Sequence, residues 1–136
     1  MRRTDLERWL DAYERLWRTA GTDELSEIFS EDATYSPGPF EKPRRGLEAI
    51  AELWESERLG PDESFEMDSE VVAVDGDTGV ARIEVRYGSP RERLYRDLWI
   101  VRFESDGRCT RFEEWPFWPP GADGEIAGRE SAAESA

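Results

Sequence analysis

Two acidic residues, Asp97 and Glu114, occupy the most β-rich part of the chain at a spacing that lets them act together. They lie within residues 94–118, where two runs rich in aromatic and β-branched residues surround an Asp-Gly pair and predict a long hairpin. Because side chains alternate along a strand, Asp97 shares a face with Trp99, and Glu114 shares one with Phe112. If the aromatic residues face the interior, both acids do too. One of two neighbouring carboxyl groups in such a setting should hold its proton near neutral pH.

The hairpin loop decides how these two acids face each other. With a four-residue Glu-Ser-Asp-Gly loop they lie directly across from one another, and with a two-residue Asp-Gly loop they are diagonal neighbours. An odd-length loop would break this matching. In the functional interpretation one acid serves as a general acid and the other as a base. In the alternative, an arginine such as Arg44 or Arg45 neutralises a structural acid. Hydrogen bonds from Tyr13 and Tyr35 would have the same effect.

Composition limits the remaining chemistry to carboxylates, tyrosines, arginines, Lys42 and Cys109. The chain of 136 residues has no histidine and one cysteine. This excludes Ser-His and Cys-His nucleophilic devices, His-ligated zinc and an internal disulfide. Cys109 is expected to be a packing residue on the strand after the turn. Asp32 has no second carboxylate at a ligand-like spacing, so we predict neither a metal site nor a cofactor.

The chain is strongly acidic, with a formal charge of -14 from 32 acidic and 18 basic residues. A nucleic acid would be repelled by such a protein and is not an expected partner. No apolar run approaches the roughly 18 residues needed to span a bilayer. The first residues also lack the apolar stretch of a signal peptide. We therefore expect a cytoplasmic protein that does not contact a membrane.

Three helices are expected ahead of the β-rich part. Thr4 and Glu7 have the spacing of a capping box and open an amphipathic helix that ends before Gly21. Residues 22–29 are predicted to form a short second helix, because Thr22 is a good cap and an apolar stripe follows. Residues 47–59 form the third, which a Gly-Pro pair stops.

Strands dominate the rest of the chain. Residues 33–35 predict a brief strand, and the three prolines within residues 36–43 require an irregular loop. From residue 65 onward the hydrophobic period changes to two, first up to the Asp-Gly-Asp turn at residues 75–77 and then over residues 81–87. Three helices, a short strand and about four antiparallel strands make an α+β domain with its helices on one side of a curved sheet.

The chain divides into one domain and a tail. Residues 1–120 are long enough and aromatic enough to form a single domain with a sizeable core. Residues 121–136 are small and polar with one large apolar residue, Ile126. They predict a disordered acidic tail.

Four segments match a known pattern. They are Trp-Leu-Asp-Ala-Tyr at 9–13, Phe-Ser-Glu-Asp-Ala-Thr-Tyr at 29–35, Pro-Arg-Arg-Gly at 43–46, and the stretch at 101–115 that begins Val-Arg-Phe and ends Glu-Glu-Trp. On these segments the chain resembles the nuclear transport factor 2-like superfamily, in its SnoaL-like branch, which includes polyketide cyclases and ketosteroid isomerases. The resemblance implies a cystatin-like cone, in which a curved antiparallel sheet wraps around three N-terminal helices and encloses a pocket. It also implies a homodimer packed sheet to sheet.

The resemblance does not carry ketosteroid isomerisation over to this chain. In the ketosteroid isomerases a helix tyrosine, a base carboxylate and a strand aspartate are the functional residues. The matching positions here are Tyr13, Pro37 and Trp99. Two of the three groups are absent, so that reaction is not expected.

Three functions remain open. The first is binding of a small apolar or aromatic molecule in an aromatic pocket. The second is a cofactor-independent isomerase, cyclase, lyase or hydrolase that uses Asp97 and Glu114 in acid-base chemistry. The third is a non-catalytic dimerisation domain with a filled core. The expected ligand-binding residues are Tyr13, Trp17, Tyr35, Trp54, Tyr87 and Trp99.

A homodimer through the outer face of the sheet is expected as well. Leu98 and Ile100, flanked by Arg96 and Arg102, would otherwise be apolar groups exposed on a broad sheet, and such patches usually mark contacts. Glu84 and Glu113 on the same face are expected to pair with those arginines, within or across subunits.

Overall fold

The computed structural model of the chain describes residues 1–58, 63–89 and 92–120. The predicted tail at residues 121–136 lies outside the described residues. The elements, in chain order, are α1 (Arg3–Trp17), the short 3-10 helix η1 (Leu25–Glu27), β1 (Phe29–Ser36), β2 (Arg44–Arg45), α2 (Leu47–Glu57), β3 (Ser64–Asp75), β4 (Thr78–Ser89), β5 (Arg93–Phe103) and β6 (Cys109–Phe117).

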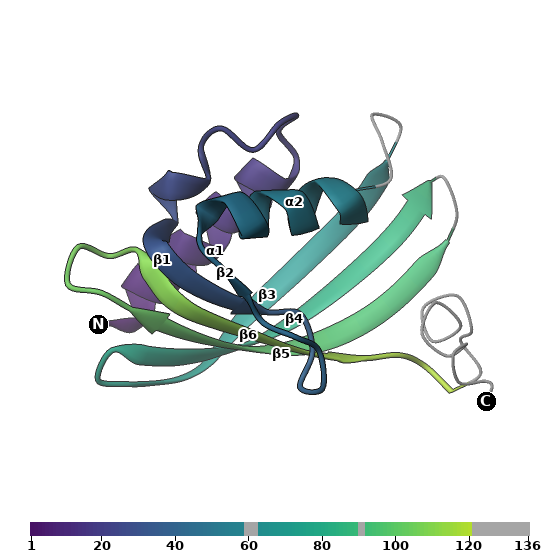
Figure 1. Cartoon of the computed structure of the whole chain (residues 1–136). Helices are drawn as coiled ribbons and strands as arrows, with labels where there is room; N and C mark the ends of the chain where they lie inside the picture. The colour runs from purple at the N-terminus through teal and green to yellow at the C-terminus, as the bar shows by residue number, and fades with distance from the viewer. Residues whose placement is uncertain (59–62, 90–91, 121–136) are drawn as a thin grey trace.

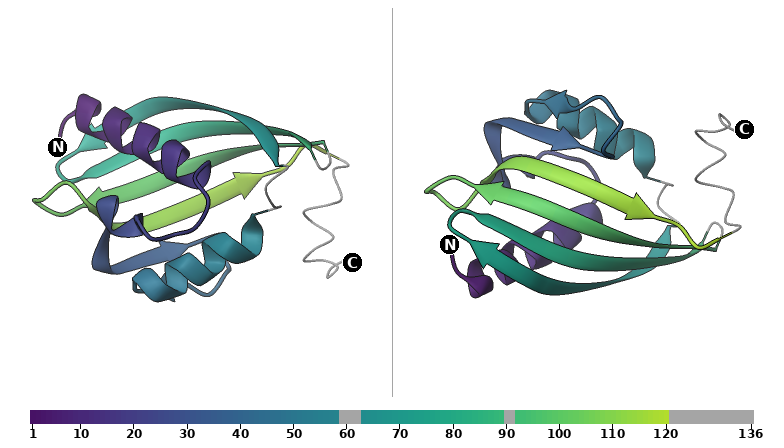
Figure 2. Two further views of the ribbon diagram at one scale, coloured as in Figure 1. Left: turned by 90° about the horizontal axis from the view of Figure 1, so that it is seen from above. Right: turned by 90° about the horizontal axis from the view of Figure 1, so that it is seen from below.

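Six strands form one curved sheet in the order β2-β1-β6-β5-β4-β3, and the sheet does not close (Figure 1). Both α-helices lie on the same face of the sheet, as the views from above and below show (Figure 2). The α+β fold with helices on one side of a curved sheet is therefore confirmed. The fully antiparallel sheet is not, because β1 pairs with β6 in parallel. All other pairings are antiparallel.

The second of the three expected helices is a 3-10 turn of three residues. Tertiary contacts end this turn. The carbonyl oxygen of Ile28 accepts hydrogen bonds from the backbone N–H of Cys109 at 2.8 Å and from Trp9 Nε1 at 2.9 Å, so it is not used to continue a helix. Phe29 then pairs with Cys109 in the sheet. The strand therefore starts at Phe29, well ahead of the expected residues 33–35.

Helix α1 buries one apolar stripe against the sheet. The stripe follows the helical period and consists of Leu6, Trp9, Leu10, Tyr13 and Leu16. The helix begins at Arg3, and the N–H of Arg2 donates to Asp5 Oδ2 at 2.8 Å, so the expected capping box at Thr4 and Glu7 is not the one used. Neither α-helix in the described part of the chain has the length and apolarity needed to cross a bilayer.

Helix α2 is tied at both ends. Gly46 precedes it, and the Gly46 N–H donates to the carbonyl oxygen of Ala33 in β1 at 2.8 Å. Arg58 follows it and donates to the carbonyl oxygens of Gly21 at 2.8 Å and Leu16 at 2.9 Å. These bonds fix α2 over the sheet beside α1, and Trp54 is fully buried between them.

Candidate active site

A cavity of about 430 Å³ lies between the two helices and the inner face of the sheet. Its deep end contains well-buried residues such as Tyr13 and Tyr35, whereas exposed residues such as Glu41 and Arg44 mark its mouth. The lining residues are Tyr13, Trp17, Tyr35, Pro37, Glu41, Arg44, Leu53, Glu57, Phe65, Met67, Val85, Tyr87, Arg93, Tyr95, Trp99, Glu114, Pro116 and Trp118. The volume falls in the range of small-molecule sites in proteins.

Strands β5 and β6 bring Asp97 and Glu114 to the same face as diagonal neighbours. Trp99 is the residue directly opposite Glu114, and Pro116 is the one opposite Asp97. Of the two arrangements expected from the loop, this is the diagonal one. The pairing follows from the period of two, which puts Asp97 and Trp99 on one side of β5.

The loop between these strands has an odd number of residues, yet Asp97 and Glu114 still lie on the same face of the sheet. Residues 104–108 connect the strands. Arg102 pairs with Arg111 while Phe103 pairs with Cys109, so β6 contains one residue more than β5 at this point. This bulge compensates for the odd loop and returns the inner residues of β6 to the inner face.

Asp97 is a buried acid with one firm partner. It is 2% exposed, and its Oδ2 accepts a hydrogen bond from Trp99 Nε1 at 2.9 Å. No N–H or hydroxyl donor among the described residues reaches its buried Oδ1, whereas the Glu114 carboxyl group is within hydrogen-bonding reach of Asp97. Burial raises the pKa of Asp97, and the hydrogen bonds from Glu114 and Trp99 oppose that rise.

Glu114 is the member of the pair with the more strongly raised pKa. Burial raises its pKa well above the ordinary value, and the negative charge of Asp97 raises it further. A proton shared by the two carboxyl groups offsets the cost of burying two charges. Glu114 lines the cavity and Asp97 does not. The acid with the more strongly raised pKa is therefore the one that a ligand can touch.

Two tyrosines supply neutral hydroxyl groups at the deep end. Tyr13 Oη and Tyr35 Oη are 2.7 Å apart, and either can be the donor. Burial raises the pKa of both hydroxyls well above their ordinary value, so both stay protonated. One of the two protons is used in the pair, and the other remains for a ligand oxygen.

The mouth carries charged residues that sequence reasoning missed as site residues. Glu41, Glu57 and Arg93 line the cavity there together with Arg44, which the sequence suggests only as a neutralising partner for an acid. Partial desolvation raises the pKa of Glu57, and the charge of Arg44 opposes that rise. For two of these residues the sequence pattern indicated the direction of the side chain. Glu57 follows Trp54 by one helical turn, and Arg93 has the same strand parity as Asp97.

The structure brings together most of the residues predicted to form the site. Trp54 is the exception among the aromatic residues, because it packs edge-on behind the wall at ring-centre distances of 4.9 Å from Tyr13 and 4.8 Å from Trp17. No arginine of the described residues forms an ion pair with either acid. The described part of the chain contains no group of three metal-ligating side chains. The predicted residues that line the cavity are Tyr13, Trp17, Tyr35, Tyr87, Trp99 and Glu114.

Comparison with known proteins gives one family match and several similar structures. The model of the SnoaL-like domain matches residues 6–112. No curated protein matches the sequence significantly. An LEH-like epoxide hydrolase from M. tuberculosis is 17% identical, with 84% of each chain covered and a TM-score of 0.66.

Two further solved structures are similar. One is a nuclear transport factor 2-like protein of unknown function from Mesorhizobium loti, with 20% identity, 86% of this chain and 94% of that chain covered, and a TM-score of 0.63. The other is SalBIII, an epoxide hydrolase/cyclase-like enzyme in pyran ring formation in the polyether salinomycin, with 16% identity, coverage of 82% and 89%, and a TM-score of 0.65. At these identities the likeness shows the shared fold alone.

Proposed function

The chain belongs to the SnoaL-like domain family, and from this membership and the acid pair beside its cavity we propose that it is a cofactor-independent enzyme that protonates an oxygen of a small apolar molecule. The observation that carries the proposal is the position of Glu114 in the cavity lining, where burial, and then the negative charge of Asp97, raise the pKa of its carboxyl group. A general acid must be protonated at working pH and must reach the ligand, and Glu114 meets both requirements.

Opening of an epoxide ring is the reaction that fits best. Glu114 gives its proton to the epoxide oxygen as the carbon–oxygen bond breaks. A water molecule, or a hydroxyl group of the same ligand, bonds to the carbon and returns a proton to Glu114. The product is a diol in the first case and a cyclic ether in the second. Two structural neighbours are an LEH-like epoxide hydrolase and an epoxide hydrolase/cyclase-like enzyme, and this likeness supports the choice.

Asp97 and the tyrosines have supporting roles in this scheme. Asp97 is a positioning residue, because it accepts the bond that orients the Glu114 carboxyl group and does not line the cavity. In the Tyr13–Tyr35 pair one hydroxyl group donates to the other. The second hydroxyl group donates a hydrogen bond to the developing alkoxide. Aromatic walls hold the apolar part of the ligand.

Binding without catalysis is the second candidate. The aromatic lining of the cavity favours it, since Trp17, Tyr87, Tyr95 and Trp118 all lie on the wall. The third function considered, a dimerisation domain with a filled core, fits less well with a cavity of about 430 Å³.

Turnover assays with single-residue variants test the enzyme proposal. Apolar epoxides, with and without an internal hydroxyl group, are incubated with wild type, and products are followed by mass spectrometry. Glu114→Gln should lower kcat by roughly 100-fold or more, as expected when a general acid is lost. Glu113→Gln is the matched control, because Glu113 immediately precedes Glu114 and lies on the outer face. Equal rates for both variants would exclude Glu114 as the acid.

A further inference from the structure

Arg93 is placed to bind a ligand at the cavity mouth. It is the first residue of β5 and shares the inner face with Tyr95, Asp97 and Trp99. Its cross-strand partner is Tyr87, and the guanidinium carbon of Arg93 lies 4.5 Å from the centre of the Tyr87 ring. This stacking holds the planar side chain against the wall of the cavity.

Among the described residues, the guanidinium group of Arg93 has the Tyr87 ring as a neighbour, but its Nε has no hydrogen-bond acceptor. Among the described residues no carboxylate lies within ion-pair distance of it, and its Nε is buried without a hydrogen-bond acceptor. Arg96, on the same strand and the opposite face, shows the contrast, because its Nε donates to Glu84 at 2.9 Å. A buried N–H without a partner is costly, and none of the described residues supplies an acceptor for it.

The neighbours of Arg93 define the acceptor. The planar guanidinium group of an arginine, with its fork of N–H donors, matches the two oxygens of a carboxylate. Glu41, Glu57 and Arg44 also line the cavity at this end, so the neighbours of Arg93 carry one net negative charge, which would repel a dianion such as a phosphate monoester more strongly than a monoanion. A single carboxylate therefore fits this end of the cavity.

We propose that the ligand of the cavity is an apolar monocarboxylate, with its carboxylate on Arg93 and its reacting oxygen at Glu114. This rests on the proposed function, because it names the ligand class of the same cavity. Along β5 the four residue steps from Arg93 to Asp97 span about 13 Å. The ligand thus has a flat or extended apolar body between its two polar ends, in contact with Tyr87 and Tyr95.

A pair of fluorescent probes distinguishes the contribution of Arg93 to binding from that of the apolar cavity. Anilinonaphthalene sulfonate is a flat aromatic monoanion, and N-phenylnaphthylamine is its neutral counterpart. Both are titrated into wild type, Arg93→Gln, Arg93→Lys and Arg96→Gln. We expect Arg93→Gln to weaken binding of the anionic probe by about tenfold or more, with the neutral probe changed less than about twofold. Arg93→Lys should fall between wild type and Arg93→Gln, and Arg96→Gln should match wild type.

The alternative outcomes are distinguishable. If both probes bind wild type and Arg93→Gln alike, the inference fails and the proposed cavity function stands. If neither probe binds wild type, the cavity function fails and the inference with it. Equal weakening of both probes by Arg93→Gln, or an equal loss in Arg96→Gln, would also overturn the role of Arg93.

Competition then tests the ligand class. Naphthoate and naphthyl phosphate are used to displace the anionic probe from wild type. Naphthoate should displace it at the lower concentration, and this advantage should shrink in Arg93→Gln. Stronger displacement by naphthyl phosphate would overturn the assignment of a monocarboxylate.

Discussion

Two Trp residues make the same local contact in opposite surroundings. Trp99 Nε1 donates to Asp97 two residues earlier at 2.9 Å, and Trp115 Nε1 donates to Glu113 two residues earlier at 3.3 Å. The first pair is buried on the inner face, whereas Trp115 is 39% exposed on the outer face. A buried acceptor that loses its donor has no water to replace it, so the buried bond should contribute more to the free energy of unfolding than the exposed one.

This contrast gives a matched pair of variants. Trp99→Phe should lower the free energy of unfolding by about 1–3 kcal/mol from the lost hydrogen bond, in addition to the loss from the smaller ring. It should also raise the pKa of Asp97 further, because the Trp99 bond lowers that pKa. Trp115→Phe should change stability by less than about 1 kcal/mol. Urea unfolding measures both variants, and equal losses would contradict the assignment.

Glu114 links stability to pH. Its pKa is raised in the folded state, so folding is favoured most below the unfolded value of about 4.3, and this contribution is lost as pH rises through the folded pKa. The slope is at most about 1.4 kcal/mol per pH unit for one proton. Glu114→Gln cannot ionise and should flatten the fall in stability that begins as the pH rises above the unfolded pKa. Glu113→Gln should keep the wild-type slope, and a wild-type slope in Glu114→Gln would contradict the raised pKa.

At the scale of elements, the position of α2 depends on the backbone of Gly46. Its φ of 92° and ψ of 156° fall in a region that is essentially restricted to glycine. The same residue donates to Ala33 in β1, so it joins the sheet to the helix that carries Leu53 and Glu57 to the cavity. Gly46 is the single residue between β2 and α2, so its conformation sets the direction in which the chain enters the helix.

Gly46→Ala should therefore lower the free energy of unfolding by about 1–3 kcal/mol. Gly88→Ala is the control, because Gly88 has no positive φ and the nearest atom to an added Cβ is the rotatable Ser64 hydroxyl at 3.3 Å. It should change stability by less than about 0.5 kcal/mol. Similar losses in both variants, measured by urea unfolding, would show that backbone strain is not the cause.

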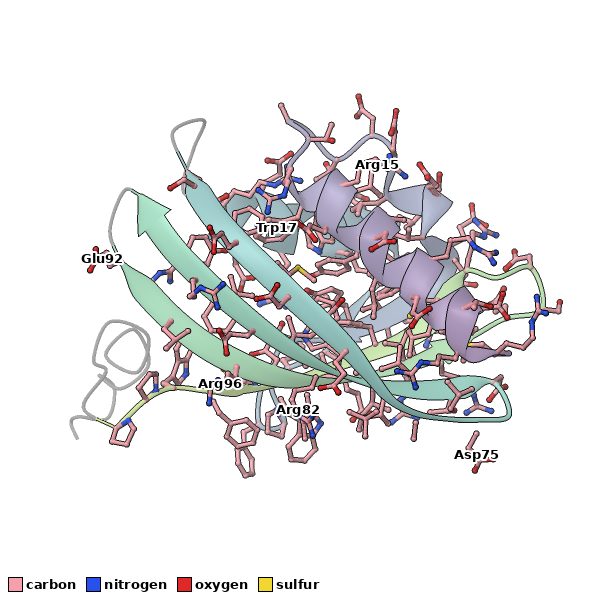
Figure 3. The ribbon with its side chains drawn as sticks, turned by 180° about the vertical axis from the view of Figure 1, so that it is seen from behind. Arg15, Trp17, Asp75, Arg82, Glu92 and Arg96 are labelled. Carbon is pink, nitrogen blue, oxygen red and sulfur yellow. The ribbon has the colours of Figure 1, made fainter. Side chains whose placement is uncertain are left out.

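At the scale of the whole molecule, the outer face of the sheet exposes large apolar side chains among its charged residues. Leu98 and Trp115 are cross-strand partners and are each 39% exposed. Charged residues surround them, and Figure 3 shows Arg82 and Arg96 on this side of the sheet, away from Trp17 on the helix side. Of the two expected ion pairs, that of Glu84 with Arg96 forms within the chain, while Glu113 faces Arg111 instead.

We propose that this face joins two copies of the chain. Wild type should sediment as a dimer at tens of micromolar, and Leu98→Glu should sediment as a monomer with an unchanged circular dichroism spectrum, because it places a charge in the apolar centre. Val72→Glu, at an exposed position of the edge strand β3, should remain dimeric. A monomeric wild type at these concentrations would contradict the proposal.

The sequence by itself determined the directions of side chains along each element. The period of two placed Asp97 and Glu114 on one inner face, and the helical period placed Tyr13 on the buried stripe of α1. Such directions follow from local backbone geometry, so they can be derived without knowing what each element packs against. The resemblance in four short segments was enough to indicate the family.

Only the tertiary structure decided what each side chain meets. Residues 22–29 became a turn and the start of a strand because Cys109, far along the chain, bonds to the Ile28 carbonyl. The bulge in β6 selected the diagonal acid pair, and the packing of α2 put Trp54 behind the cavity wall. The same packing placed Glu57 and Arg93 together at the mouth of the cavity. Depth of burial and the choice of partner depend on contacts between distant segments, and local periodicity contains no information about them.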